Sequence, residues 1–456
     1  MEKLNVALVA GTMEMYPGVA ESVYSEHQRQ LLDLSKELDF NLKIYKELLT
    51  TEKRAKEIRK DIDSKDIDFI IIFHPTYISG DIIFELMKTK ANIGLWAIEE
   101  PDEEGPITLT SFVCLMQNSA IAGHCFKKHK KRFKWFFGNK KGKYFKSRFE
   151  ITIRALTAVK NIKNSKVAQI GEIAGGHRDS YYDERTIYEN LGVEVVRGIE
   201  IEDIIAMAKK IRGKAVDREV ENIISSCSKV RVDDSKIINS VKTFLAVKKI
   251  CDEEGFQAVG FSCWPKIWEF DNLAACLSNS LLNSIGIPAS CEGDVLSAIS
   301  MLIMKYLSDE STALMDFPRF DDSDDSLLLW HCGSAPVEMA GKNGVSCDPH
   351  FRGAFEDKGE FADLAPVTDM VFKDSDITVF RLSGEGDKFY YFTGRTFDGG
   401  KKSWVGSRGW VKDLKFYNEK IKVIDLVNTI FLNSIHHHFP IVLKDISKYL
   451  KEFAYW

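Results

Sequence analysis

Short apolar runs alternate with charged, amphipathic stretches along the first third of the chain. The apolar runs have the length of strands and cover Leu4–Ala10, Phe40–Tyr45, Phe69–Phe73 and Ile93–Ile98. The stretches between them, such as Ser22–Leu38 and Glu52–Asp63, have helical periodicity. Continuous apolar strands separated by helices are typical of a parallel sheet covered on both faces. This pattern predicts a Rossmann-like α/β domain over residues 1–160.

The same alternation begins again after a long helix predicted over Tyr144–Ile162. The predicted strands are Ser165–Gly171, Val193–Val196, Ala258–Cys263 and Ile287–Cys291. The predicted helices are Tyr182–Leu191, Glu202–Ile211, Ile237–Glu254 and Val295–Leu307. We therefore expect a second Rossmann-like α/β domain over residues 161–310.

Helical periodicity fades after about residue 310. Short predicted strands follow, including Leu327–Trp330, Thr378–Leu382 and Phe389–Thr393, and Gly- and Asp-containing turns separate them. Helices over Val423–Leu432 and Ile446–Phe453 end the chain. The expected fold class is α/β: two Rossmann-like parallel-sheet units followed by a β-rich C-terminal domain over residues 311–456, which completes the site considered below.

Composition narrows the classes of partner. The 456 residues are 45% hydrophobic and 28% charged, as in ordinary globular proteins, and the net charge is −5. Without an excess of cations the chain is not expected to bind nucleic acid or an anionic membrane surface. No apolar run approaches the 18 residues of a transmembrane helix.

The nine cysteines indicate the compartment. No two of them have CxxC spacing, and most lie in apolar or helical stretches. This pattern fits reduced, buried thiols in a cytoplasmic protein rather than a disulfide framework. The apolar segment Leu4–Ala10 lacks a credible cleavage site and is better explained as a first strand.

Acidic residues stand at two places where strands are expected to end. Glu292 and Asp294 follow the predicted strand Ile287–Cys291, and ligands in open α/β sheets bind at the carboxyl ends of strands. Asp294 is also explained as the N-cap of the next helix, whereas Glu292 has no such structural role. Asp316 lies in an apolar segment 316 − 292 = 24 residues later, room for a helix and a returning strand. We expect both carboxylates at the same edge of one sheet.

Histidines provide candidate nitrogen ligands. His436, His437 and His438 are consecutive, and imidazole is the commonest neutral metal ligand, although a surface cluster without a ligand is an alternative. His331 is a candidate ligand, substrate contact or core histidine. Two carboxylates with one imidazole suit Mn²⁺ or Mg²⁺ better than Zn²⁺. No Cys pair or HExxH motif indicates a zinc site.

A glycine-rich segment, Gly171–Gly176, follows the first strand of the second unit. Such a loop can hold phosphate, but its spacing does not match GxGxxG and the chain has no GK[ST] motif. We expect a plain strand-to-helix turn there. The missing phosphate loops also argue against a nucleotide-dependent enzyme.

The segment Gly286–Leu302 (GIPASCEGDVLSAISML) resembles the metal-site segment of the L-fucose and L-arabinose isomerases, the fucose isomerase-like family. In that family a Glu in an E-x-D element precedes a helix, a second carboxylate follows, and a His-containing loop near the C-terminus completes the metal site. The segments Trp96–Pro101 and Trp330–Gly333 are also similar to members of the family. This chain is shorter than typical L-fucose isomerases, and the residues around His331 differ from those around the second metal histidine of arabinose isomerases.

The resemblance implies an aldose–ketose isomerase that moves a proton between two carbons through an enediol, with Mn²⁺ or another divalent cation such as Mg²⁺ or Co²⁺. Glu292 and Asp316 would be catalytic groups and metal ligands, and His438 the third ligand. His437, His331, Trp330 and Trp96 would contact the sugar, with core packing an equal alternative for the two tryptophans. The resemblance also implies a homo-oligomer, a trimer or hexamer. The alternative function is a non-catalytic sugar-binding or regulatory protein with two Rossmann-like lobes.

Overall fold

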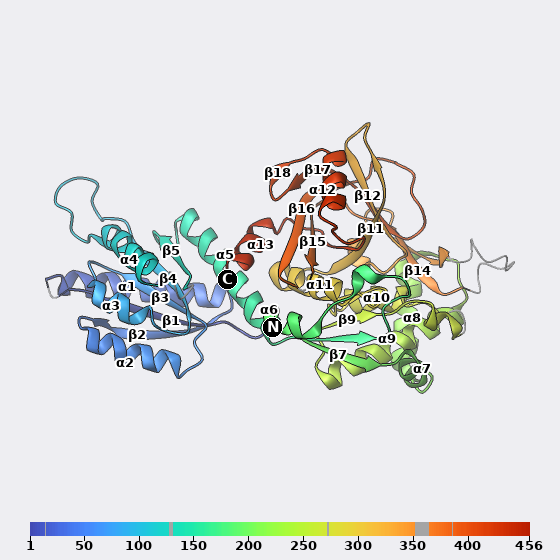
Figure 1. Cartoon of the computed structure of the whole chain (residues 1–456), viewed down its shortest axis with the longest axis horizontal. Helices are drawn as coiled ribbons and strands as arrows, with labels where there is room; N and C mark the ends of the chain where they lie inside the picture. The colour runs from blue at the N-terminus through green and yellow to red at the C-terminus, as the bar shows by residue number, and fades with distance from the viewer. Residues whose placement is uncertain (14, 127–130, 271–272, 352–363, 385) are drawn as a thin grey trace. The chain divides into compact units, whose positions relative to one another are not determined.

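The computed structural model describes the chain except residues 14, 127–130, 271–272, 352–363 and 385. Its internal contacts divide it into two compact units, shown in Figure 1. Unit 1 comprises residues 1–161 and 451–456, and unit 2 comprises residues 162–450. The division into three domains stays a prediction, because the second and third expected domains fall within unit 2.

Unit 1 contains a parallel sheet with the strand order β2-β1-β3-β4-β5. The strands are β1 Asn5–Gly11, β2 Asn41–Leu49, β3 Phe69–His74, β4 Asn92–Ala97 and β5 Phe133–Phe137. The helices are α1 Pro17–Glu37, α2 Glu52–Asp63, α3 Gly80–Leu86, α4 Ser111–Cys125 and α5 Lys143–Lys163.

Helices cover both faces of this sheet. Helices α2, α3 and α4 pack on one face with Ile70 and Ile72 of β3, whereas α1 and α5 pack on the other with Phe69 and Ile71. Successive side chains of a strand point to opposite faces, so a strand buried on both sides has a continuous apolar sequence. This is the three-layer arrangement expected from the sequence pattern.

The end of the chain belongs to unit 1. Helix α13 (Ser447–Tyr455) leads to Trp456, whose ring lies 6.1 Å from that of Phe69. Glu452 forms an ion pair with Lys134 at 2.7 Å, and the Tyr455 hydroxyl donates to a backbone carbonyl of β5. These last residues therefore complete the apolar face covered by α1 and α5.

Unit 2 begins with a second parallel sheet, in the order β10-β9-β6-β7. Its strands are β6 Lys166–Ile170, β7 Glu194–Ile199, β9 Ala258–Phe261 and β10 Ala289–Ser290. The associated helices are the 3-10 turn η2 Arg178–Ser180, α6 Glu184–Leu191, α7 Ile201–Ala208, α8 Lys214–Ser226, α9 Asp234–Glu254, α10 Cys276–Ser284 and α11 Val295–Ser308.

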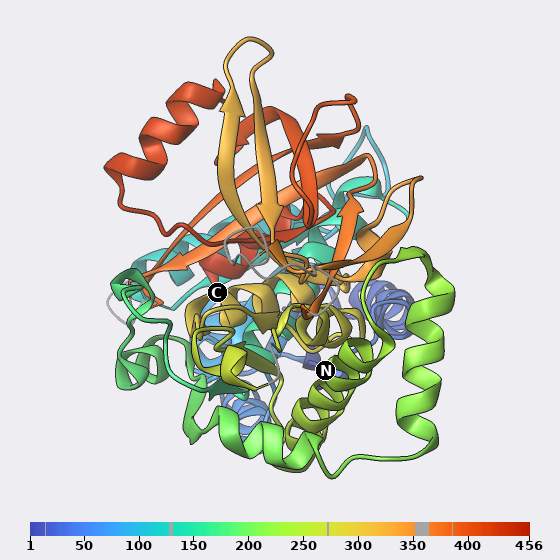
Figure 2. The same ribbon diagram turned by 90° about the vertical axis from the view of Figure 1, so that its right-hand side faces the viewer.

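A mixed sheet forms the rest of unit 2. Its strands are β8 Cys227–Val230, β11 Thr312–Asp321, β12 Ser326–His331, β13 Val345–Pro349, β14 Pro366–Val371, β15 Ser375–Ser383, β16 Lys388–Phe397, β17 Ser407–Phe416, β18 Glu419–Lys420 and β19 Phe439–Val442, with helix α12 Val423–Leu432 beside them. Strand β12 pairs with both β11 and β17, so β11, β12, β17, β16, β15 and β19 close into a ring (Figure 2).

Helix α11 joins the two sheets of unit 2. It contacts β9 and β10 of the parallel sheet, and β11, β15 and β19 of the ring. Nearly all of its side chains are buried, as expected for a helix that is apolar on every side. Its N-terminus lies at the junction of the two sheets, where the candidate site is found.

The expected fold class is confirmed: two parallel α/β sheets precede a β-rich sheet. The expectation that Glu292 and Asp316 lie at the edge of one sheet is wrong. Glu292 follows β10 of the parallel sheet, whereas Asp316 lies within β11 of the mixed sheet, because the chain leaving α11 starts a new sheet instead of returning. Within the described ranges, no helix has the length and apolar character needed to span a bilayer.

Candidate active site

Glu292 lies in a tight turn between β10 and α11. It has a left-handed backbone (φ 61°), as does Gly293 (φ 73°). A Cβ atom on Gly293 would lie 3.0 Å from the carbonyl oxygen of Glu172, so a glycine lets the loop after β6 approach this turn. The backbone N–H of Ala174 in that loop donates to the Glu292 carbonyl at 3.0 Å. The ends of β6 and β10 are thereby joined around the Glu292 side chain.

His438 directly precedes β19 and is buried. Its Nδ1 lies 2.9 Å from Oδ2 of Asp294 in a hydrogen bond. Its Nε2 lies 3.3 Å from Oε2 of Glu292 and 3.9 Å from Oδ1 of Asp316. A carboxylate on one ring nitrogen fixes the imidazole and leaves the other nitrogen free to act as a ligand. The structure therefore brings Glu292, Asp316 and His438 together.

Asp294 is both the N-cap and a partner of the site. Its side chain accepts from the backbone N–H of Ser297, which caps α11, and from Nη1 of Arg381 at 2.7 Å. Burial raises the pKa of Asp294, but Arg381 and His438 outweigh this effect and hold the pKa well below its usual range. The sequence indicated the cap, but not the contacts to Arg381 and His438.

Three buried polar atoms of the site have no hydrogen-bond partner in the described part of the chain. They are Oε2 of Glu292, Oδ1 of Asp316 and Nδ1 of His177. Nδ1 of His177 is only 2.7 Å from Oε2 of Glu292, but the contact lacks hydrogen-bond geometry. Since buried polar atoms are nearly always hydrogen-bonded, these orphaned donors and acceptors fit a bound cation.

The potential ligand atoms form two separate groups of three residues. His177, Glu292 and His437 make one, and Asp316, His331 and His438 make the other; within each, the ligand atoms lie within 4.8 Å of one another. Carboxylate oxygens with imidazole nitrogens suit Mn²⁺ or Mg²⁺. The residues present therefore fit the divalent cation expected from the sequence.

The two carboxyl groups have opposite pKa shifts. Burial raises the pKa of Glu292, but the neighbouring imidazoles of His437 and His438 outweigh it and hold the pKa well below its usual range. Burial also raises the pKa of Asp316, and here the shift stays upward. Burial lowers the pKa of His438, but Asp294 and Glu292 reverse the effect and raise it to about 10. Different environments thus favour different protonation states for the two carboxyls.

The other two histidines of the triplet have distinct surroundings. His437 is 41% exposed, with Nδ1 2.7 Å from Oδ2 of Asp179 and Nε2 3.5 Å from Oε2 of Glu292. His436 is buried; its Nε2 lies 3.0 Å from the Ser180 hydroxyl, and its Nδ1 accepts from the backbone N–H of His438. His436 therefore holds the loop in shape, whereas His437 faces the site.

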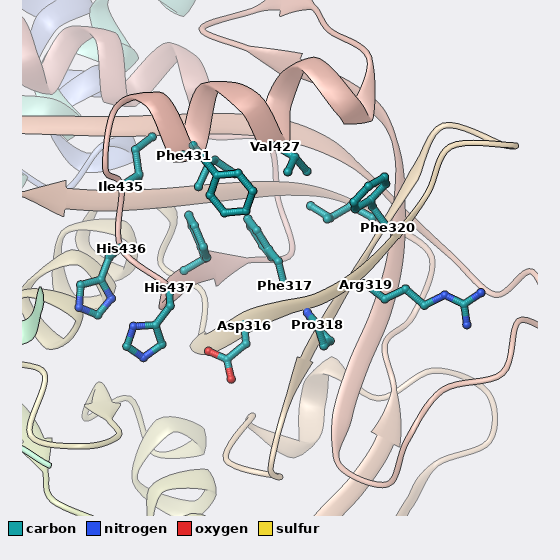
Figure 3. Close-up of a pocket in the computed structure, with 13 residues that line it drawn as sticks. Asp316, Phe317, Pro318, Arg319, Phe320, Val427, Phe431, Ile435, His436 and His437 are labelled. Carbon is teal, nitrogen blue, oxygen red and sulfur yellow. The ribbon is translucent and has the colours of Figure 1, made fainter. Parts of the chain in front are cut away.

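A pocket of about 610 Å³ opens beside these residues. Asp316, His436 and His437 lie at one end, as Figure 3 shows, and Arg319 and Phe320 lie at the other. Much of the remaining wall is aromatic or aliphatic and includes Phe317, Val427, Ile430, Phe431 and Phe439. The polar end can bind reacting oxygen atoms, while the apolar wall offers a surface for the less polar face of a ligand.

Two further predicted site residues, Trp330 and His331, are the last residues of β12. Nδ1 of His331 lies 3.2 Å from the Ser334 hydroxyl and 3.3 Å from Sγ of Cys332. Trp330 is half-buried, and its indole N–H donates to the Val405 carbonyl.

Trp96 has no exposed surface. In the core of unit 1 its ring lies 4.6 Å from that of Phe73 and 4.9 Å from that of Phe145, and its N–H donates to the Gly138 carbonyl. These contacts favour the core-packing alternative for Trp96.

Sequence reasoning missed His177, Asp179 and Trp264. The indole N–H of Trp264 donates to Oε1 of Glu292 at 3.1 Å, which leaves Oε2 directed toward the histidines. His177 directly follows the Gly171–Gly176 segment that we interpreted as a plain turn. Its position after the first strand of the second sheet was a usable signal, because ligand-binding residues collect at the carboxyl ends of parallel strands.

The chain is similar to proteins described as sulfoquinovose isomerases. The protein from Alkalicoccus urumqiensis is 23% identical over 356 residues, 77% of each chain. The protein from Priestia aryabhattai is 21% identical over 346 residues, 75% of this chain and 74% of its own. A third, from Clostridium sp. (strain MSTE9), is 29% identical over 100 residues, 22% of each chain. No family model matches the chain. These relatives support the expectation that the chain is an enzyme of the isomerase class.

Proposed function

We propose that the chain is a divalent-metal-dependent aldose–ketose isomerase whose substrate is a sulfonated sugar, sulfoquinovose. The observation that carries the proposal is the position of His438, which Asp294 orients so that Nε2 faces Glu292 and Asp316. The orphaned oxygen atoms of the two carboxylates support a bound cation. The description of the relatives as sulfoquinovose isomerases supports the choice of substrate.

Glu292, Asp316 and His438 are the residues that would hold the cation. When bound, Mn²⁺ or a similar ion polarises a substrate carbonyl and stabilises negative charge on its oxygen atoms. Trp264 holds one oxygen of Glu292, so that the other faces the substrate side. The aromatic wall of the pocket, which includes Phe317 and Phe431, offers an apolar surface against which the carbon skeleton of the substrate can pack.

The two carboxyls supply the proton transfer. Conversion of an aldose to a ketose removes the proton from C2, adds a proton to C1, and moves one proton from the C2 hydroxyl to the C1 oxygen. Glu292, whose pKa is held low, stays ionised, and Asp316, whose pKa is raised, is more easily protonated. The pair can therefore hold one carboxylate and one carboxylic acid, as an acid–base pair requires.

Activity with defined sugars tests the proposal. Protein freed of metal by a chelator is incubated with sulfoquinovose, glucose 6-phosphate or L-fucose, with and without Mn²⁺, and ketose formation is followed by NMR in D₂O. We expect Mn²⁺-dependent conversion of sulfoquinovose, with deuterium appearing at C1 of the ketose because the proton passes through exchangeable carboxyls. Glu292→Gln and Asp316→Asn should each lower the rate by about 10²–10⁴-fold.

The control is Asp376→Asn, which removes a carboxylate that is 63% exposed on β15 and should leave the rate unchanged. Conversion of L-fucose but not of sulfoquinovose would contradict the proposal that sulfoquinovose is the substrate. Saturable binding of sugar without conversion, with Mn²⁺ present, would overturn the isomerase and favour the non-catalytic sugar-binding alternative.

A further inference from the structure

A cluster of buried sulfur atoms lies beside the candidate active site, outside the proposed chemistry. Cys263 follows β9, Cys276 begins α10, Cys291 follows β10 and Cys332 follows β12. We call these four residues the thiol cluster. Sγ of Cys263 lies 2.9 Å from that of Cys291, and Sγ of Cys276 lies 3.3 Å from that of Cys332. Cysteines that are far apart in the sequence thus have their sulfur atoms close together in the folded chain.

Two imidazoles meet the thiol cluster. Ligand atoms of Cys276, Cys332 and His350 all lie within 4.8 Å of one another, and so do those of Cys291, His331 and Cys332. His350 follows β13 and is buried, as are Cys276 and Cys291. Cys332 belongs to both groups and therefore links them. These thiols and imidazoles are separate from Glu292, Asp316 and His438, the proposed ligands of the carboxylate site.

We propose that Cys276, Cys332 and His350 bind a zinc ion at a second site, distinct from the carboxylate site. Thiolate and imidazole are the ligands that Zn²⁺ takes in tetrahedral sites. With Zn–S bonds of about 2.3 Å, two thiolates of a tetrahedral site lie about 3.8 Å apart. The observed 3.3 Å between Cys276 and Cys332 needs only a small separation of the two sulfurs. Cys291 shares only the second group with Cys332 and is not among the three proposed ligands.

The two sites select different ions through their donor atoms. Carboxylate-rich sites favour hard cations such as Mn²⁺ and Mg²⁺, whereas thiolates favour softer ones such as Zn²⁺. A zinc ion would tie the N-terminus of α10 to the ends of β12 and β13. His331 precedes Cys332, with Nδ1 3.3 Å from its sulfur, so the ion would also fix the histidine that faces Asp316 and His438. This inference does not depend on the isomerase activity.

Metal content and cobalt spectroscopy of the whole chain test the proposal. Wild-type protein purified under reducing conditions should contain one equivalent of zinc that survives dialysis against a weak chelator. After complete removal of zinc, added Co²⁺ should give an intense near-ultraviolet band from thiolate-to-cobalt charge transfer. Cys332→Ser and His350→Asn should each lose the retained zinc, and Cys332→Ser should weaken the band. Cys251→Ser, which removes a buried thiol of α9 outside the cluster, should change neither signal.

Wild-type protein alone can overturn the proposal, so the result does not depend on whether a variant folds. Absence of both the zinc and the charge-transfer band, with the cysteines found as free thiols, would show that the thiol cluster is ordinary core packing. A Cys263–Cys291 disulfide with no zinc would also overturn it. Zinc lost from Glu292→Gln but retained in Cys332→Ser would place the ion at the carboxylate site instead.

Discussion

Asp294 links the stability of α11 to the candidate site, because one carboxylate caps the helix, pairs with Arg381 and orients His438. We predict that Asp294→Asn lowers the free energy of unfolding by about 3–5 kcal/mol, because it leaves the Arg381 charge buried and unpaired. Urea denaturation measures the loss. The control is Asp183→Asn at the more exposed N-cap of α6, which should leave the free energy of unfolding nearly unchanged because Asn caps a helix about as well as Asp.

The same carboxylate should make stability sensitive to acid. The folded pKa of Asp294 lies well below its usual value, which is about 3.9 in an unfolded chain. Its contribution is therefore complete above about pH 4 and is lost as the pH falls through the folded pKa. We expect the stability of the wild type to fall more steeply below about pH 4 than that of Asp294→Asn, as measured by urea midpoints in metal-free buffers across this range. Parallel curves for the two proteins would contradict this prediction.

His177 should act on the site through Glu292, since its Nδ1 lies 2.7 Å from Oε2 of that residue. We predict that His177→Ala weakens Mn²⁺ binding or isomerisation by about 10–100-fold. The fold should persist, because the side chain is 22% exposed in a loop. Calorimetric Mn²⁺ titration and circular dichroism give the two readouts. His124→Ala, on the exposed surface of α4, is the control.

At this scale the sequence predicted residues whose chemistry stands out locally. Glu292, Asp316 and His438 were recognisable because a carboxylate after an apolar strand, or a run of imidazoles, is unusual in itself. Arg381 was not recognisable. It is the only cation of β15, and its buried partner Asp294 is 87 residues away in the sequence.

Among the elements, the close approach of the loop after β6 to the turn after β10 positions both His177 and Glu292. We predict that Gly293→Ala lowers the free energy of unfolding by about 1–3 kcal/mol, because a left-handed φ and a Cβ 3.0 Å from the Glu172 carbonyl both oppose it. Activity should fall as the two loops separate. Gly175→Ala in the same region has no described atom within 4 Å of its Cβ and should be nearly neutral in denaturation and activity assays.

Elements with strong local patterns were predicted well. The bounds of α2 and α12 agree with those predicted from the sequence pattern. The sheet to which Asp316 belongs was not predictable, because an apolar run specifies a strand but not its partners. Strand β11 pairs with β12, which follows it directly, and with β19, which lies more than a hundred residues further along the chain.

On the scale of the whole molecule, the last residues of the chain stabilise unit 1, which also contains the first. We predict that Trp456→Ala lowers the stability of unit 1 by about 2 kcal/mol, since the half-buried ring packs beside Phe69 and the apolar face of the sheet. Hydrogen exchange of peptides from β1, β3 and β4 should become faster. Trp404→Ala, where the ring is 53% exposed, should leave these peptides unchanged.

Strand β19 lies between β11 and β15 in the closed ring, although it is among the last strands in the sequence. During synthesis, β11 and β15 are made before β19. One edge of each of these two strands therefore stays unpaired until residues 439–442 have been made. His438 directly precedes these residues, so the pairing of β19 that closes the ring also places the His438 imidazole in the candidate site. A nascent or prematurely terminated chain therefore lacks the ring and this ligand together. If the cation binds as proposed, completion of its site would report that residues 438–442 have been made and have paired with β11 and β15.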